Sequence, residues 1–474
     1  MKILLVPYDN GTYMTFFPQG LGYISRVLED QGYEVDIWQQ DIHHYPPEEI
    51  ISVIDNGGYE AVGIGLIGGY WQYKMLKKLS DAISKCKTRD KVTYVLAGYG
   101  PAPEPEYFLR KMQADVCVLG EGELTAVELF DAIANNKSFE NIKGIAYLDD
   151  DDQFKRNLPR ELIQDVDSIK LPAFNKFPID VYRLRPSSCA GPTDFVMPVL
   201  SGRGCTFRCN FCYRMDSGWR PRGFDSIIEE VNLLREDYGI TYIIFNDDLL
   251  MTSKPRTIAL MEAFIKSNKG KGLQVVWSCN ARLNFATPEI LKLMREAGCV
   301  FNNYGIESFD NEIMKVMKKG LNTKITEEGV KNTFESGIKP GLNMIWGNIG
   351  ETKRHLDQSV DFLLKWDDGT QKRTIRPVTP YPGSPLYYHA IENGLLDSEN
   401  PCEDFYERKH VNSDLLAVNF TDLSDGEFHE SLCDANKKLI NAYHTRNLAN
   451  EIEVTEDLYS NLNASFRGYR KMES

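Results

Sequence analysis

The sequence has no long apolar run, no basic patch and few cysteines for its length. No stretch reaches the roughly 18 apolar residues that a membrane-spanning helix needs, so we expect no membrane span. Acidic and basic residues are interspersed and sum to a net charge of −14, so we expect no nucleic-acid partner. Residues 1–13 hold one lysine and a short apolar run, which predicts a first strand and not a signal peptide. We therefore expect a cytoplasmic protein.

Cysteine is both scarce and unevenly placed. Ten cysteines in 474 residues are too few for a disulfide scaffold. Three of them, Cys205, Cys209 and Cys212, lie close together, and in a chain without a signal peptide such a cluster favours metal or redox chemistry. The others are scattered, and we interpret them as ordinary buried thiols.

The order of predicted elements indicates an α/β protein of several parts. Residues 1–140 alternate strands and helices, which predicts a doubly wound sheet with its ligand beyond the carboxyl ends of the strands. Residues 141–191 begin with a hairpin around an acidic turn and continue as a proline-containing linker. Residues 192–388 repeat six β-α units, which predicts a partial (β/α)6 barrel. Residues 389–474 are predicted to be mostly helical.

The cysteine cluster has the spacing Cys-x3-Cys-x2-Cys and directly follows the first strand of the barrel-like series. Three thiolates on one loop suit three irons of a [4Fe–4S] cluster. The fourth iron then has no protein ligand and is open to the amino and carboxylate groups of S-adenosylmethionine (SAM). A zinc site is the alternative, but zinc usually takes four ligands, and no fourth Cys or His lies nearby in the sequence.

At these residues the chain resembles the radical SAM superfamily, and in particular its cobalamin-binding branch. The resemblance covers about residues 1–390. It is carried by the cysteine loop with Phe211 before the third cysteine, and by the segments IIFNDDLL, WSCNAR, NYGIES, WGNIGET and PYPGSPL. One departure is Ile349, where the family usually has a proline.

The resemblance implies which residues surround SAM. The expected SAM-binding residues lie at the ends of the barrel strands and next to the cysteines: Phe211, Tyr213, Asp247, Arg282, Glu307 and Gly347. For Arg282 and Glu307, a salt bridge that lines the barrel is an equally good interpretation.

Glycines gather at the predicted strand ends of the first 140 residues. Taken alone they indicate only turns, although small residues there let a flat ligand approach the backbone. Together with the cysteine loop they resemble a cobalamin-binding domain. The residues that this resemblance implies as cobalamin-binding are Gln19, Gly20, Gly65, Leu66, Gly98, Tyr99, Gly100, Gly120 and Glu121.

The first domain departs from the family pattern at two places. Ala97 stands where the family commonly has a glycine, and no Asp-x-His-x-x-Gly motif follows the first strand. We interpret His43 and His44, which follow the second strand, as surface residues. We therefore expect cobalamin whose cobalt has no histidine ligand from this chain.

The resemblance implies a radical SAM enzyme, and we favour methylation of an unactivated carbon of a small metabolite through a 5′-deoxyadenosyl radical and methylcobalamin. Cyclisation, ring contraction or oxidation without methyl transfer are alternatives. A non-catalytic cobalamin carrier or sensor is a third, against which the cysteine triplet argues. The reaction would need an external low-potential electron donor such as flavodoxin or ferredoxin.

We expect the ligand-binding edges of both sheets to flank one substrate cavity, with Tyr381 in the cavity wall. The proline-rich segment that contains Tyr381 also suits a rigid turn.

Overall fold

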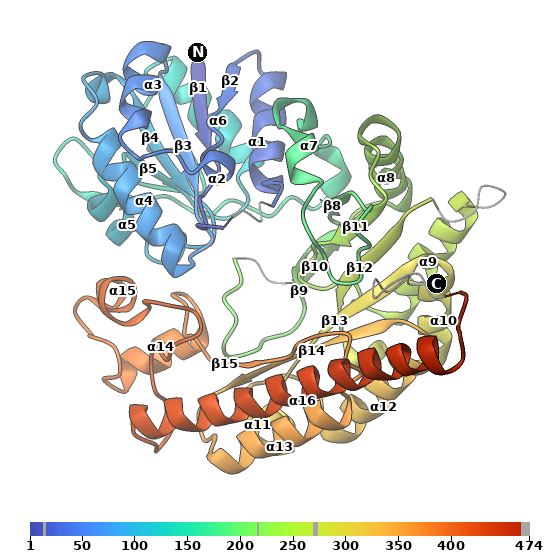
Figure 1. The fold of residues 1–474 in the computed structure, drawn as a ribbon. Coiled ribbons are helices and arrows are strands. Elements are labelled where there is room, and N and C mark those ends of the chain that lie inside the picture. The colour runs from blue at the N-terminus through green and yellow to red at the C-terminus, as the bar shows by residue number, and fades with distance from the viewer. Residues whose placement is uncertain (13–15, 216–217, 269–273, 466–474) are drawn as a thin grey trace.

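The computed structural model of the chain describes residues 1–12, 16–215, 218–268 and 274–465. It contains a seven-stranded sheet, a six-stranded sheet and a two-stranded ribbon. Figure 1 shows the first sheet with its helices above the second, and a C-terminal group of helices below. Among the described residues, no helix combines the length and the apolar character needed to cross a membrane.

The first sheet has the strand order β2-β1-β3-β4-β5-β6-β7, in which β1 to β5 are parallel. Its strands are β1 (Lys2–Val6), β2 (Glu34–Ile37), β3 (Ala61–Gly65), β4 (Thr93–Ala97), β5 (Val116–Val118), β6 (Ile145–Leu148) and β7 (Phe154–Arg156). The predicted doubly wound sheet is therefore confirmed. The hairpin β6–β7 adds two antiparallel strands to it, so this sheet continues past the expected boundary at residue 140.

Helices cover both faces of this sheet and bury two separate apolar clusters. One face carries α1 and α6, and the other carries α3, α4 and α5. The helices of this part are α1 (Gln19–Asp30), α2 (Gln40–His43), α3 (Glu49–Gly57), α4 (Tyr70–Ile83), α5 (Pro105–Met112), α6 (Glu123–Ala134) and, in the linker, α7 (Ile179–Tyr182). The helices α1, α3, α4, α5 and α6 carry apolar residues at helical spacing, which form much of the buried side.

The second sheet is the predicted partial barrel of six parallel strands, with the order β15-β14-β13-β12-β11-β8. Its strands are β8 (Val196–Val199), β11 (Tyr242–Phe245), β12 (Val276–Ala281), β13 (Cys299–Glu307), β14 (Lys339–Trp346) and β15 (Ile375–Pro377). The helices outside it are α8 (Phe224–Tyr238), α9 (Lys254–Asn268), α10 (Pro288–Glu296), α11 (Asn311–Val316), α12 (Thr323–Glu335) and α13 (Lys353–Lys365). Buried tryptophans of β12 and β14 belong to the core between strands and helices. Between β8 and α8 the chain forms the ribbon of β9 (Gly202–Cys205) and β10 (Gly218–Pro221).

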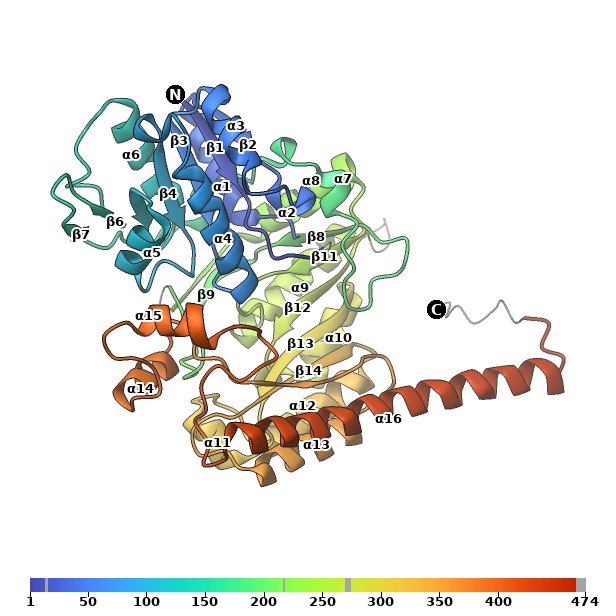
Figure 2. The same cartoon turned by 60° about the vertical axis from the view of Figure 1, so that its left-hand side comes forward.

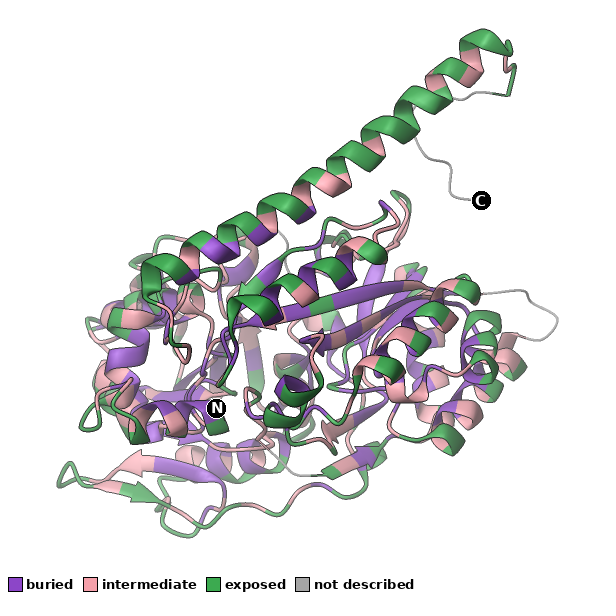
Figure 3. Cartoon of the chain, turned by 90° about the horizontal axis from the view of Figure 1, so that it is seen from below, coloured by how far each residue is buried: buried purple, intermediate pink, exposed green. Residues whose placement is uncertain are grey.

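The C-terminal region is mostly helical, as expected, and packs against both preceding parts. It comprises α14 (Pro385–Glu392), α15 (Pro401–Glu403), the π-helix η5 (Asp404–Lys409) and α16 (Asp425–Ser460), and residues 466–474 of the predicted region lie outside the described residues. The ring of Tyr406 stacks on Tyr73 of α4 at 4.5 Å. The first turns of α16 bury Phe428 and Leu432, and the side chain of Asn436 hydrogen bonds the backbone of Ile375 in the edge strand β15. Figures 2 and 3 show the far half of α16 leaving the body as a mostly exposed rod.

Candidate active site

The cysteine loop lies inside the β9–β10 ribbon. Cys205 is the last residue of β9 and pairs with Gly218 at the start of β10. Cys209 is buried in the loop and Cys212 is exposed. Because β9 follows β8 directly, the loop stands at the carboxyl end of the barrel strands, where (β/α) barrels place their catalytic groups.

The three thiols lie within electrostatic reach of one another. Although Cys212 is exposed as a residue, partial desolvation of its thiol and the neighbouring Cys209, Asp248 and Cys205 together raise the pKa of Cys212 to about 11. No three His, Cys, Asp or Glu side chains of the described residues are placed to hold a single metal ion. Thiolates of an iron–sulfur cluster bind different irons and need not converge on one point. The donor set therefore fits a cluster with three cysteine ligands.

Asn210 fixes the backbone of this loop. Its side chain exchanges two hydrogen bonds of 3.0 Å with the side chain of Asn348, which follows β14. Its backbone N–H donates to Met317 and its carbonyl accepts from Leu386. Asn210 thus ties the cysteine loop to three segments that are distant in sequence. No sequence pattern predicted this role, because a single asparagine in a loop belongs to no recognisable motif.

Asp247 fixes the segment that leads into the cysteine loop. Its carboxylate accepts hydrogen bonds from the backbone N–H and the hydroxyl of Ser201, which lies between β8 and β9. Burial raises the pKa of Asp247 to about 6, although these hydrogen bonds act in the opposite direction. The predicted contact of Asp247 with SAM stays a prediction. The next residue, Asp248, is exposed and interacts electrostatically with Cys205 and Cys212.

Arg282 and Glu307 lie beside the cysteine loop, and both contact Lys319. The guanidinium of Arg282 stacks 3.3 Å from the ring centre of Phe207 and donates to the carbonyl of Lys319. Glu307 pairs with the ammonium group of Lys319 at 3.0 Å. Its φ of +73° is rare for a residue with a side chain, and such strain is concentrated at functional sites. Phe207 and Lys319 belong to this group and were missed in the sequence, where neither stands in a recognisable motif.

The other expected SAM-binding residues surround the same loop. The ammonium group of Lys319 lies 5.6 Å from the ring centre of Phe211. Gly347 ends β14 with a φ of +98°, and its N–H donates to the carboxylate of Glu351 at 2.8 Å. A side chain at Gly347 would collide with Phe428 of α16, which explains why only glycine fits there.

The carboxyl edge of the first sheet faces the cysteine loop. The ring of Tyr99, which follows β4, meets the ring of Tyr213, which follows Cys212, at 6.0 Å between centres. Gly383 lies between Tyr213 and Pro103 of the first domain, because a side chain there would reach Tyr213 at 2.5 Å and Pro103 at 2.9 Å. The two edges are therefore close to each other, and the expectation that they flank one substrate cavity stays a prediction.

Glycines occupy several positions at the carboxyl edge of the first sheet. Gly98 has a φ of +103°, and a side chain there would lie 2.4 Å from the carbonyl oxygen of Leu66. A side chain at Gly100 would likewise press on Leu66. By contrast, side chains at Gly65 and Gly120 would meet no atom of the described residues within 4 Å. At Gly65 and Gly120 the edge therefore leaves open space next to the backbone, which a large flat cofactor can approach closely.

Gln19 and Glu121, two of the residues expected at cobalamin, hold the domains together. The side-chain amide of Gln19 donates to the carbonyl of Pro198 in β8 at 3.2 Å. Glu121 accepts from Arg203 of β9 and Arg220 of β10, each at 2.8 Å. Burial raises the pKa of Glu121, but these hydrogen bonds outweigh it and lower the net pKa. A side chain at Gly20 would meet no described atom within 4 Å. Contacts of all three with cobalamin stay predictions.

We expect Glu121→Gln to weaken this junction strongly. Removing one partner of a buried ion pair costs about 3–5 kcal/mol, because the other charges stay buried. Urea unfolding of the apoprotein should show a loss of this size. Glu106→Gln is the matched control, since Glu106 pairs with Arg110 on the exposed surface of α5, where such pairs contribute about 0–1 kcal/mol. Equal losses in the two variants would contradict the junction.

The two histidines after β2 are placed at the same edge of the sheet. His44 lies 2.9 Å from the carboxylate of Asp9, which follows β1, and the ring of His43 lies 4.9 Å from that of Tyr45. The expectation of cobalt without a histidine ligand from this chain stays a prediction.

Tyr381 packs into an aromatic group of the C-terminal region. Its ring meets His410 at 5.3 Å and Phe405 at 5.9 Å. His410 is fully buried, and neither ring nitrogen has a hydrogen-bond partner among the described residues. Burial, aided by the charge of Lys74, lowers the pKa of His410 to about 4. The role of Tyr381 in a substrate cavity stays a prediction.

His410 should make the stability of the protein fall with acidity. The unfolded chain binds a proton near pH 6.5, whereas the folded His410 stays neutral to about pH 4, so stability is complete above pH 6.5 and is lost as the pH falls toward 4. We expect the difference in unfolding free energy between wild type and His410→Phe to change by about 2 kcal/mol between pH 7 and pH 5. Chemical denaturation at both pH values measures it, with the exposed His444→Phe as control. A difference that does not change with pH would refute this.

Comparison with known proteins places these features in a known class. Residues 199–363 match the Radical SAM superfamily and residues 12–130 match the B12 binding domain. The two matches cover the partial barrel with its cysteine loop and the sheet with its glycine edge. The chain is therefore a radical SAM enzyme that carries a B12-binding domain.

Relatives define the family further. An uncharacterized methyltransferase of Pyrococcus horikoshii is 30% identical over 417 residues, which cover 84% of this chain and 85% of the relative. The cytidylyl-2-hydroxyethylphosphonate methyltransferase of Streptomyces wedmorensis is 26% identical and aligns over 87% of this chain and 83% of its own. The structure of the radical SAM methyltransferase TsrM from Kitasatospora setae, with cobalamin and a [4Fe–4S] cluster bound, superposes with a TM-score of 0.68 at 19% identity, covering 83% of this chain and 78% of TsrM. The chain belongs to the cobalamin-dependent radical SAM family, whose cofactors are SAM, an iron–sulfur cluster and cobalamin.

Proposed function

We propose that this enzyme methylates an unactivated carbon of a small molecule, with Cys205, Cys209 and Cys212 as the ligands of a [4Fe–4S] cluster. When bound, the cluster with SAM supplies a 5′-deoxyadenosyl radical, and cobalamin supplies the methyl group. Cobalamin lies on the glycine edge of the first sheet, against Gly65, Leu66 and Gly98 to Gly100. The substrate lies between this edge and the cysteine loop.

The contact between Tyr99 and Tyr213 is the observation that carries the proposal. Tyr99 lies beside the open glycines of the first domain, and Tyr213 directly follows a cluster ligand, with 6.0 Å between their rings. A carbon from which hydrogen is removed near the cluster is thus also near the cobalamin edge. Radical methyl transfer needs this proximity, because a substrate radical must meet the methyl group before it reacts elsewhere.

The residues around the loop hold SAM in this proposal. Arg282, fixed by its stack on Phe207, presents a cation where the carboxylate of SAM binds the open iron. Glu307, oriented by Lys319, accepts hydrogen bonds from the amino group or the ribose hydroxyls. Because both side chains are already positioned by protein contacts, little ordering remains when SAM binds.

The names of several relatives support methyl transfer and a small substrate. Bacteriochlorophyllide d methyltransferases of Chlorobaculum tepidum are among them, and the structure of TsrM has been determined with tryptophan as substrate. An anaerobic magnesium-protoporphyrin IX monomethyl ester cyclase of Synechocystis is 24% identical, so a cyclisation is the outcome that the experiment must separate from methyl transfer. We place the reaction in the reducing cytoplasm, with flavodoxin or ferredoxin as electron donor.

An anaerobic incubation with SAM, cobalamin, a low-potential reductant and a small-molecule extract tests the proposal. Mass spectrometry should find a metabolite that gains one CH2 unit, and all three hydrogens of the new methyl group should carry label from methyl-deuterated SAM. 5′-Deoxyadenosine and S-adenosylhomocysteine should both accumulate. Formation of 5′-deoxyadenosine with a product that contains no label would refute methyl transfer in favour of another radical reaction.

A further inference from the structure

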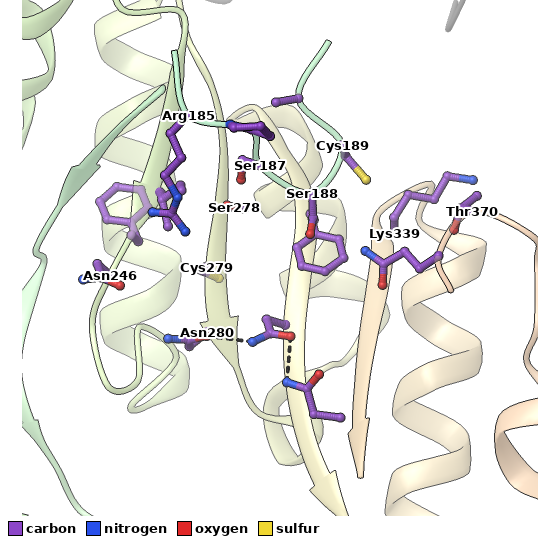
Figure 4. Close-up of a pocket in the computed structure, with 18 of the residues that line it drawn as sticks. Arg185, Ser187, Ser188, Cys189, Asn246, Ser278, Cys279, Asn280, Lys339 and Thr370 are labelled. Atoms are coloured by element: carbon purple, nitrogen blue, oxygen red, sulfur yellow. Dashed lines mark hydrogen bonds between the residues drawn. The ribbon is translucent and has the colours of Figure 1, made fainter. Parts of the chain in front are cut away.

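The partial barrel encloses a cavity of about 790 Å³ on the inner face of its strands. Its walls are residues of β11, β12, β13 and β14, closed by segments 185–190 and 370–372 (Figure 4). Pockets for small ligands have volumes of about 300–1,000 Å³, so the space suits a metabolite or a large part of one. Tyr381 is not among the described residues that line it.

A ladder of three asparagines crosses one wall of the cavity. The side chain of Asn343 donates to that of Asn303 at 2.9 Å, and Asn303 donates to Asn280 at 3.1 Å. Asn280 in turn donates to the carbonyl of Asp247, whose carboxylate holds the start of the cysteine loop. Figure 4 shows the ladder between neighbouring strands. Its side chains are therefore fixed with respect to the cysteine loop.

The position of the ladder along its strands shows how far it lies from the cysteine loop. Arg282 comes two residues after Asn280, and alternate residues of a strand point to the same face. Arg282 reaches the thiols of Cys209 and Cys205 electrostatically. The ladder is thus one inward-facing position from Arg282, whereas Lys339 and segment 370–372 lie at the opposite, amino ends of β14 and β15.

The charges that line the cavity are all positive. Arg185, Lys339 and Lys372 are lining residues, and none of the described lining residues is Asp or Glu. Arg185 lies 3.1 Å over the ring of Phe16 and has no carboxylate partner among the described residues, and burial lowers its pKa to about 10. Lys339 has only Asp368 at 3.9 Å. In a chain with a net charge of −14, a cavity with cations and no acid is selective for anions.

We propose that the barrel cavity binds an anionic end of the substrate, a carboxylate or a phosphate ester, through Arg185 and Lys372, while the asparagine ladder hydrogen bonds its polar middle part. This inference rests on the proposed function, because it takes the ligand to be the molecule that reacts at the cysteine loop. Arg185 suits either anion, since a guanidinium binds both through two parallel N–H groups. An amide ladder supplies donors and acceptors without charge, as a neutral polar segment requires.

Titration calorimetry of the reconstituted holoenzyme, without SAM, tests this with inorganic phosphate and succinate as probes. We expect at least one anion to bind, and Arg185→Gln/Lys372→Gln to weaken its binding about tenfold or more, because both charge-assisted hydrogen bonds to the anion are lost. Phosphate alone binding indicates a phosphate ester, and succinate alone a carboxylate. Lys292→Gln/Lys331→Gln removes the same charge from exposed helix surfaces and should bind as wild type does.

The cluster and cobalamin absorbance of every variant shows whether it is folded. If the double variant loses this absorbance, Asn343→Ala, which removes only the outer end of the ladder, and Lys372→Gln alone replace it. No binding of either anion to wild type, or equal binding by the cavity and control variants, would overturn the proposal. Failure of the proposed function would give a different result: the wild type would still bind an anion, but no labelled methyl group would be transferred.

Discussion

Reconstituted Cys205→Ala, Cys209→Ala and Cys212→Ala variants are each expected to hold almost no iron–sulfur cluster and to form no 5′-deoxyadenosine from SAM. The three thiols come from one loop that Asn210 and Asp247 hold in place, and each variant removes one of the three proposed thiolate ligands. Loss of a group that only orients a metal ligand already costs about 10–100-fold. Loss of a ligand itself should cost more, and the activity should fall to background.

Iron content, visible absorbance and SAM cleavage under anaerobic conditions measure this effect. Cys433→Ala is the matched control, because Cys433 is an exposed thiol on α16, away from the loop. It should keep the iron content and the SAM cleavage of wild type. Cobalamin retention should survive in all four variants, since the glycine edge belongs to another domain. A loop variant that still contains four irons per chain would refute the assignment of the ligands.

Local pattern was enough to predict the two sheets and the cysteine loop. Each β-α unit carries its own signal, because a strand and the helix that covers it bury adjacent runs of apolar residues. The thiol spacing is likewise local, spanning residues 205–212. These features needed no knowledge of what lies across the fold.

The contacts that position the site are not local, and the sequence did not predict them. Asn210 and Asn348 are 138 residues apart, and Glu121 and Arg203 are 82 apart. Their residue types are common, so their role becomes visible only when the folded chain brings the two partners together. The same holds for the hairpin β6–β7, which the sequence predicted as a strand pair but placed in the linker, whereas it pairs with the edge strand β5.

The arrangement of the two edges explains why the domains are joined by buried ion pairs and not by an apolar seam alone. Glu121 follows Gly120 at the glycine edge and is held by β9, the strand that ends at Cys205. One set of charged hydrogen bonds thus fixes the glycine edge relative to Cys205, the first of the three proposed cluster ligands. Directional bonds set a separation more tightly than apolar packing does, and the reaction depends on that separation.

Gly65 offers the sharpest test of where cobalamin binds. It ends β3 at the carboxyl edge of the first sheet, and a side chain there would meet no atom of the described residues within 4 Å. The protein alone therefore tolerates a larger residue at this position. If the corrin ring lies on this edge, Gly65→Phe fills the space that the cofactor needs.

Gly65→Phe is expected to bind cobalamin about 10- to 100-fold more weakly than wild type while its cluster content is unchanged. Overpacking costs about 1–3 kcal/mol even in a protein core, and about 3 kcal/mol corresponds to about 100-fold in affinity. Titration of the visible absorbance with hydroxocobalamin measures the affinity, and iron analysis of the same samples reports the fold of the barrel. Gly426→Phe is the control, because Gly426 also has open space in front of it but lies at the start of α16. Wild-type affinity in Gly65→Phe would move cobalamin away from this edge, and with it the path by which a methyl group reaches the substrate.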